Sequence, residues 1–109
     1  MKYMFASDIH GSAYYCRKML EAFEAEGASR LFLLGDLLYH GPRNDLPKEY
    51  APKQVIAMLN EKKQYLTNVR GNCDAEVDQM VLEFPVLADY GILIEGRPYL
   101  LYEPWPHLQ

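Results

Sequence analysis

Three short apolar runs alternate with two amphipathic stretches, and this alternation constrains the fold more than any other feature of the chain. The runs cover residues 2–7, 31–34 and 65–69, and helical periodicity covers about 13–26 and 52–62. A strand–helix–strand–helix–strand order predicts an α/β fold with a parallel-type sheet and right-handed crossovers. The run at 31–34 is of the kind that parallel sheets bury on both faces.

Local signals mark where the helices begin and end. Ser12 is a good N-cap for the first helix and Gly27 a good C-cap, while Pro52 suits the first turn of the second helix. Asp74 is expected to cap a short third helix. The inward side chains expected for that helix are Val77, Met80 and Val81.

The rest of the chain divides into a long loop and a hairpin. Residues 35–50 are rich in Gly, Pro, Asn and Asp and exceed the usual length of a connection, which indicates a functional loop. Gly96-Arg97-Pro98 separates apolar runs at 90–95 and 99–102, which predicts a carboxyl-terminal hairpin.

Composition restricts the class of protein. With 109 residues, the chain is a single small domain, and its net charge of −4 disfavours a nucleic-acid-binding surface or an anionic membrane as partner. No apolar run approaches the roughly 20 residues of a membrane span. Cys16 and Cys73 lack zinc spacing and no secretory leader is evident, so a cytoplasmic location is expected. Cys16 lies on an apolar helix face and is expected in the core.

Metal-capable side chains follow each predicted strand. Asp8 and His10 follow the first, Asp36 follows the second, and Asn72 follows the third. The carboxyl ends of parallel strands meet at one edge of a sheet, where ligands bind. Taken alone, the residues after any one strand could equally be turn or helix-cap residues instead of metal ligands. Together, carboxylate and imidazole donors predict a site for Mn, Fe or Zn rather than calcium.

The motifs D-x-H, G-D and G-N-x-[DE] in this order resemble the calcineurin-like metallophosphoesterase superfamily, and within it the YfcE-like bacterial phosphodiesterases. The resemblance rests on the stretches FASDIHGS, LLGDLLYHGPRN and VRGNCDAEVDQM. It implies half of an αββα sandwich and phosphodiester hydrolysis by a di-metal-bound hydroxide, with a small phosphodiester as substrate and manganese as the expected metal.

The resemblance also implies roles for individual residues. Asp8 and His10 would bind the first ion, Asp36 would bridge two ions, and Asn72 would bind the second and belong to the catalytic set. Cys73 stands where much of the superfamily has a catalytic histidine, and it is open whether it neighbours the catalytic site or is an inert turn residue. His40 and Arg43 in the long loop are candidates for binding the substrate phosphate, with ordinary surface positions as the alternative.

The carboxyl terminus departs from the family pattern. Residues 1–101 match the amino-terminal part of the domain, but the T-H-G-H and later G-H-x-H motifs are absent from the sequence, and 102–109 form an aberrant tail. Tyr-Glu-Pro-Trp-Pro-His can be encoded so that the adjacent frame reads Met-Ser-His-Gly-His, so we interpret this tail as frameshifted. We expect one ion or none to be retained, little turnover, and a homo-oligomer that covers a bare sheet face.

Two other function classes stay open at this point. A non-catalytic interaction module, like the phosphoesterase-like subunit of retromer, would need no tightly bound metal. A nucleotide-binding βαβ domain is disfavoured because no G-x-G-x-x-G follows the first strand.

Overall fold

A computed structural model describes residues 2–39, 46–71, 74–94 and 97–101. Three parallel strands, β1 (Tyr3–Ala6), β2 (Arg30–Leu33) and β3 (Leu66–Asn68), form one sheet in the order β1-β2-β3. The register places Ala6 beside Leu33 and Leu33 beside Asn68, so the three strands end along one line. The predicted α/β class and parallel sheet are confirmed.

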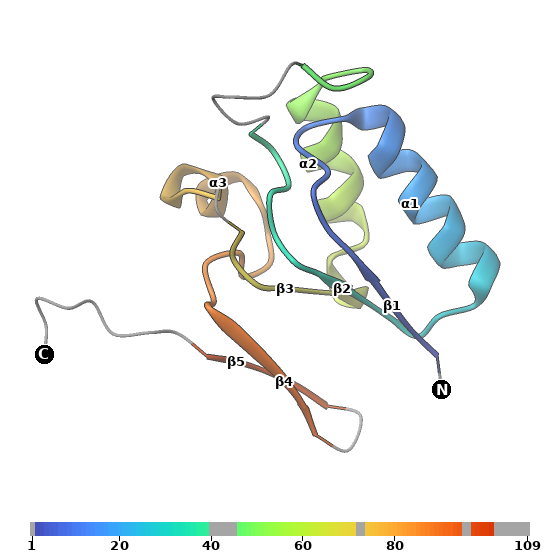
Figure 1. Cartoon of the computed structure of the whole chain (residues 1–109), viewed down its shortest axis with the longest axis vertical. Helices are drawn as coiled ribbons and strands as arrows, with labels where there is room; N and C mark the ends of the chain where they lie inside the picture. Colours follow the sequence, from blue (N-terminus) through green and yellow to red (C-terminus); the bar gives the residue numbers. More distant parts are fainter. Residues whose placement is uncertain (1, 40–45, 72–73, 95–96, 102–109) are drawn as a thin grey trace, which may run out of the picture.

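Two helices connect these strands and lie side by side against one face of the sheet (Figure 1). Helix α1 (Ala13–Glu26) begins at Ser12, whose hydroxyl accepts from the Tyr15 amide, and ends at Gly27 in the left-handed conformation. Helix α2 (Pro52–Glu61) carries its proline in the first turn and is followed by a 3-10 turn, η1 (Lys63–Tyr65). The expected helix ends are therefore confirmed to within a residue, but Tyr65 precedes β3 instead of belonging to it.

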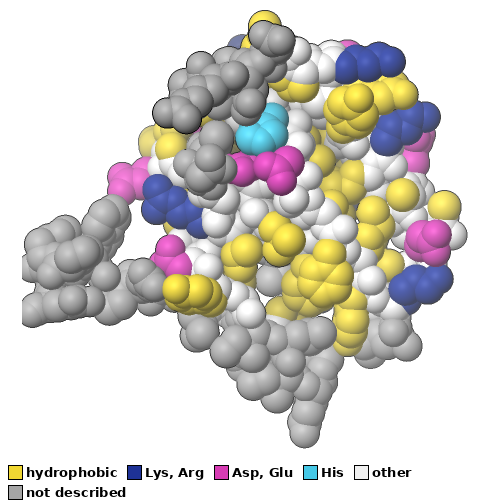
Figure 2. All heavy atoms as spheres, viewed as in Figure 1, with side chains coloured by type: hydrophobic (Ala, Val, Ile, Leu, Met, Phe, Trp, Pro, Cys, Tyr) yellow, Lys and Arg dark blue, Asp and Glu magenta, His cyan; other side chains and the backbone are white. Residues whose placement is uncertain are grey.

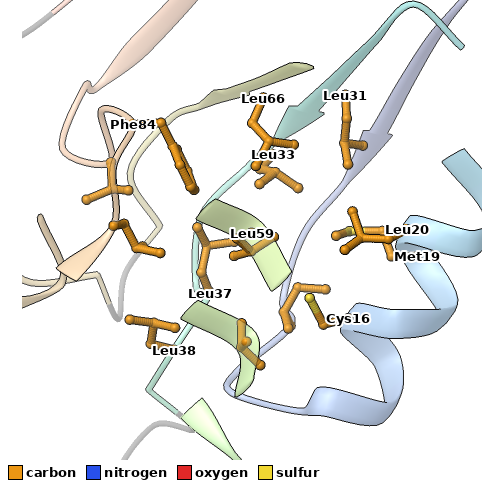
Figure 3. Packing of buried hydrophobic residues seen from close by; sticks show 14 of the residues in the cluster. Cys16, Met19, Leu20, Leu31, Leu33, Leu37, Leu38, Leu59, Leu66 and Phe84 are labelled. Atoms are coloured by element: carbon orange, nitrogen blue, oxygen red, sulfur yellow. The ribbon is translucent and has the colours of Figure 1, made fainter. Parts of the chain in front are cut away.

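The core lies between these helices and the sheet (Figure 3). Cys16, Met19 and Leu20 of α1 point toward Leu31 and Leu33 of β2, and Cys16 is fully buried as expected. Burial raises the pKa of the Cys16 thiol to about 11. Leu37 and Leu38 extend the same core beyond the end of β2, which fixes the backbone that follows this strand.

The opposite face of the sheet is apolar but open among the described residues. Leu31 and Leu33 are buried, whereas Phe5 and Leu34 are 61% and 49% exposed. The prediction that residues 31–34 are buried on both faces is wrong, because α1 and α2 cover only one face of the part of the sheet that the structure describes. Phe5 stacks on Phe32 with ring centroids 5.0 Å apart, which covers part of this surface.

A two-stranded antiparallel sheet lies beside this open face (Figure 1). Strand β4 (Tyr90–Ile94) pairs with β5 (Arg97–Leu101), so the predicted hairpin is present. Arg97 and Pro98 belong to β5 instead of separating the strands.

Helix α3 (Glu76–Val81) also differs from its expected arrangement. Its N-cap is Ala75, not Asp74, and the three side chains predicted to face inward are exposed, with Met80 84% accessible. The buried residue of this short helix is Asp78, whose carboxylate accepts from the Ala75 amide. The side chain of Asp74 is directed to another part of the structure, described below.

Candidate metal centre

The segments that follow β1 and β2 run side by side and carry the first three candidate ligands. The amides of Asp8, His10 and Gly11 donate to the carbonyls of Gly35, Asp36 and Leu37 at 3.2, 2.8 and 2.8 Å. These bonds continue the parallel pairing beyond the strands themselves. Candidate ligands 26 residues or more apart in the sequence are thereby brought to one edge of the sheet.

Asp8, His10 and Asp36 form a cluster at this edge. Each offers a donor atom, and these atoms all lie within 4.8 Å of one another. The three residues differ in burial: Asp8 is exposed, His10 is half-buried and Asp36 is buried. Figure 2 shows a histidine with acidic side chains beside it on the visible face. The predicted convergence of these three residues is confirmed.

The backbone at all three positions is unusual. Asp8, His10 and Asp36 have φ values of 61°, 49° and 55°, in the left-handed region that side chains with a Cβ rarely adopt. Such conformations persist only where the surroundings enforce them, and they cluster at functional sites. Here they turn three donor side chains toward a common point instead of leaving them to alternate along an extended chain.

The hydrogen bonds of His10 define which ring nitrogen can bind a metal. Nδ1 lies 2.8 Å from the carbonyl oxygen of Tyr39, which can only accept, so Nδ1 carries a hydrogen. Nε2 lies 3.0 Å from Oδ1 of Asp8, inside the cluster. A histidine whose outer nitrogen donates to a carbonyl is the arrangement that protein metal sites use to orient an imidazole ligand.

Interactions within the cluster favour the protonated form of His10 and the ionised form of Asp8. Partial burial by itself lowers the pKa of His10, but the bond to Tyr39 and the carboxylates of Asp8 and Asp36 together raise that pKa above its usual value. The Ser7 hydroxyl, 2.7 Å from Asp8, lowers the pKa of this carboxyl against the opposing effect of burial. Two ionised carboxylates that attract a proton to His10 would equally attract a divalent cation.

The donor set fits a borderline divalent metal. Two carboxylates and one imidazole match the ligand preferences of Mn, Fe or Zn. Exposure of Asp8 leaves one side of the cluster accessible for further ligands or a substrate. The remaining predicted site residues lie outside the described part of the chain: Asn72, Cys73, His40 and Arg43.

Sequence reasoning missed two residues that hold the cluster in place. Asp74 and Asn68 are buried polar side chains that bind the backbone of residues 35–37. A signal for Asn68 was present, because an amide inside a buried strand needs polar partners. Asp74 lies in the G-N-x-[DE] motif, but its position before a helix predicts an ordinary cap.

Comparison with known proteins decides the family. The model of the family described as calcineurin-like phosphoesterase matches residues 1–107. The chain belongs to the calcineurin-like phosphoesterase family. The family resemblance inferred from the motifs is therefore confirmed.

Individual members of the calcineurin-like phosphoesterase family give the same result. The chain is 56% identical over 102 residues to the phosphodiesterase YfcE of Escherichia coli K12, and equally to that of an O157:H7 strain. These 102 residues are 93% of this chain and 55% of the E. coli protein. The solved structure titled as Yfce, a phosphoesterase from E. coli, superposes with a TM-score of 0.84 at 48% identity, over 98% of this chain and 61% of that one. The chain therefore spans about half the length of the curated relatives it matches.

Among the described residues, none of the helices has the length and apolar character needed to cross a membrane.

Proposed function

We propose that this chain carries the amino-terminal part of a metal-dependent phosphodiesterase site. The observation that supports it best is the cluster of Asp8, His10 and Asp36, drawn from two strand ends and held in left-handed backbone. Family membership and the name of the E. coli relative supply the reaction class. The proposed substrate is a small phosphodiester.

The proposed metal is manganese, with two ions in the complete family site. Asp8, His10 and Asp36 would hold the first ion; Asp36 and Asn72 would hold the second. Bound divalent ions would supply positive charge that polarises a phosphoryl oxygen and lowers the pKa of a water. Because the second ion would have only two protein ligands in this chain, we expect it to be lost and about one ion per chain to be retained.

The protein's own groups would act mainly by positioning. The Tyr39 carbonyl keeps the hydrogen of His10 on Nδ1, which leaves Nε2 directed into the cluster. Ser7 holds the exposed carboxylate of Asp8, and this side of the cluster is where a phosphate could approach. We further propose that Asn72 and Cys73 adjoin the reacting phosphate and that His40 and Arg43 bind it from the long loop.

The absence of the family's G-H-x-H histidines from these 109 residues should impair turnover. With Mn²⁺ and bis-p-nitrophenyl phosphate, we expect rates at least about 1000-fold below those of E. coli YfcE assayed beside it, since removing groups that act as a unit costs this much or more. Rates comparable to those of the relative would contradict the impairment while supporting the reaction class. A folded chain that neither binds Mn²⁺ nor accelerates hydrolysis would argue against the proposed function itself.

The open sheet face supports a homo-oligomer as part of the proposal. Phe5, Leu34 and Tyr90 are exposed there and line a groove of about 280 Å³ together with β3 and β5. An apolar surface of this kind is usually covered by another protein surface. A second copy of the chain presents the same face and could pair with it.

Phe5→Lys should weaken this self-association. The substitution places a charge in the middle of the apolar face, at a cost to the dimer of about 1.5–3 kcal/mol, or tenfold or more in affinity. Light scattering after size exclusion should show a dimer or larger assembly for the wild type and a smaller species for the variant. Met80→Lys, on an exposed residue away from the groove, should leave the assembly unchanged. A monodisperse wild-type monomer would contradict the proposal.

The interaction-module alternative gains no support from the cluster, because a scaffold needs no convergent metal ligands in strained backbone. The proposal retains the cytoplasmic location, which is in keeping with the free thiol of Cys16.

A further inference from the structure

Asp74 is a buried carboxylate that, within the described part of the chain, accepts hydrogen bonds from backbone amides of the candidate metal centre and of its own turn. The residue is 4% exposed. Oδ2 accepts from the amides of Asp36 at 2.9 Å and Gly71 at 2.7 Å, and Oδ1 accepts from the amide of Leu37 at 3.2 Å. Three such bonds give hydrogen-bond partners to a carboxyl group that would otherwise be costly to bury.

The backbone that Asp74 binds would not hold its shape unaided. Asp36 has a φ of 55° and Gly35 a φ of 91°, and the first of these is disfavoured for a residue with a Cβ. A second buried side chain assists, because Oδ1 of Asn68 accepts from the Gly35 amide at 3.1 Å. The Asn68 amide group in turn donates to the carbonyl of Val86 at 3.3 Å. Three successive amides, of residues 35 to 37, are thus bound by side chains from β3 and the segment after it.

Close backbone packing brings the Asp74 segment onto Asp36. A Cβ placed on Gly71 would lie 2.5 Å from Oδ1 and 2.6 Å from Cγ of Asp36. A Cβ placed on Gly35 would lie 2.0 Å from the Gly71 nitrogen. Neither position has room for a side chain, because the segment after β3 lies directly against Asp36. This close approach limits the movement of the Asp36 side chain.

We propose that Asp74 is a positioning residue for the metal centre, which fixes the Asp36 turn so that the Asp36 carboxylate stays within reach of Asp8 and His10. This inference rests on the proposed function, since it gives Asp74 a role only if the cluster binds metal. It also links the third strand end to the site through hydrogen bonds within the described residues. Outer groups that orient ligands in this way contribute to metal affinity without touching the ion.

The test compares Asp74→Asn with a matched control in the whole chain. The asparagine side chain keeps one acceptor oxygen, but its NH₂ group would face a backbone N–H and cannot accept from it. The Asp36 turn should therefore loosen. We expect Mn²⁺ affinity in calorimetry to fall about 10–100-fold. The visible spectrum of bound Co²⁺ should also change, because it reports ligand geometry. Asp89→Asn changes a half-buried carboxylate that lines the apolar groove and lies outside the cluster, and it should leave both readouts unchanged.

A second variant, Asp74→Glu, keeps both carboxylate oxygens and should retain more affinity than Asp74→Asn. If Asp74→Asn does not fold, Asp74→Glu is compared with Asp89→Asn and the wild type. A folded Asp74→Asn that binds Mn²⁺ as the wild type does, or a Glu variant as weak as the Asn variant, would overturn the inference and leave the metal site intact. A wild type that binds no Mn²⁺ would instead overturn the proposed function.

Discussion

Asp36→Asn should lower the affinity of the chain for Mn²⁺ by at least about 100-fold, since even the loss of a group outside the ligand shell can cost that much. Asp36 is the buried member of the three-residue cluster. Its backbone amide donates to Asp74 and its carbonyl accepts from the His10 amide. The amide removes a negative charge and keeps the shape of the side chain. Calorimetric titration should show the loss, and the rise in melting temperature caused by Mn²⁺ should disappear with it.

Asp89→Asn is the matched control for this prediction. Asp89 is a half-buried carboxylate that lines the apolar groove and lies outside the cluster. Its substitution should leave Mn²⁺ binding unchanged. If Asp36→Asn folds and binds Mn²⁺ as tightly as the wild type, the ion is held elsewhere.

Gly35→Ala should destabilise the fold by more than about 4 kcal/mol, a loss found only where a specific packing or backbone requirement is violated. The position has a φ of 91°, and an added Cβ would lie 2.0 Å from the Gly71 nitrogen and 2.6 Å from Oδ2 of Asp74. Neither neighbour can move easily, because both belong to the network that binds the Asp36 turn. A loss of this size approaches the whole stability of a typical small domain.

Gly27→Ala separates the backbone effect from the clash. Gly27 also has a positive φ, 65°, but an added Cβ would meet nothing within 4 Å. We expect a cost of about 1–2 kcal/mol, the usual value for a left-handed residue with a Cβ. Urea unfolding of both variants measures the difference. Equal losses would show that the close approach of Gly35 and Gly71 does not constrain the fold.

The elements that the sequence predicts well are those with local causes. Ser12 and Gly27 bind the ends of α1 within a few residues of their own position, and Pro52 fixes the first turn of α2. The strand-end rule adds one non-local step, and it is enough to bring Asp8, His10 and Asp36 together. Both kinds of signal depend on residue types whose physical preferences are strong.

What the sequence does not predict depends on contacts across the chain. Asp74 binds amides 37 and 38 residues away, and the same residue before a helix looks like an ordinary cap. Met80 has helical spacing with other apolar residues, yet its helix leaves that side chain exposed. Likewise, an apolar run such as 31–34 shows that a strand is buried but not how many of its faces are covered.

The most direct test of the metal centre is a calorimetric titration of Mn²⁺ into the wild-type chain after treatment with a chelator. We expect saturable binding of about one ion per chain, in keeping with the two-carboxylate, one-imidazole donor set. A chain that is folded by circular dichroism and shows no saturable binding of Mn²⁺ would contradict the assignment of Asp8, His10 and Asp36 as metal ligands.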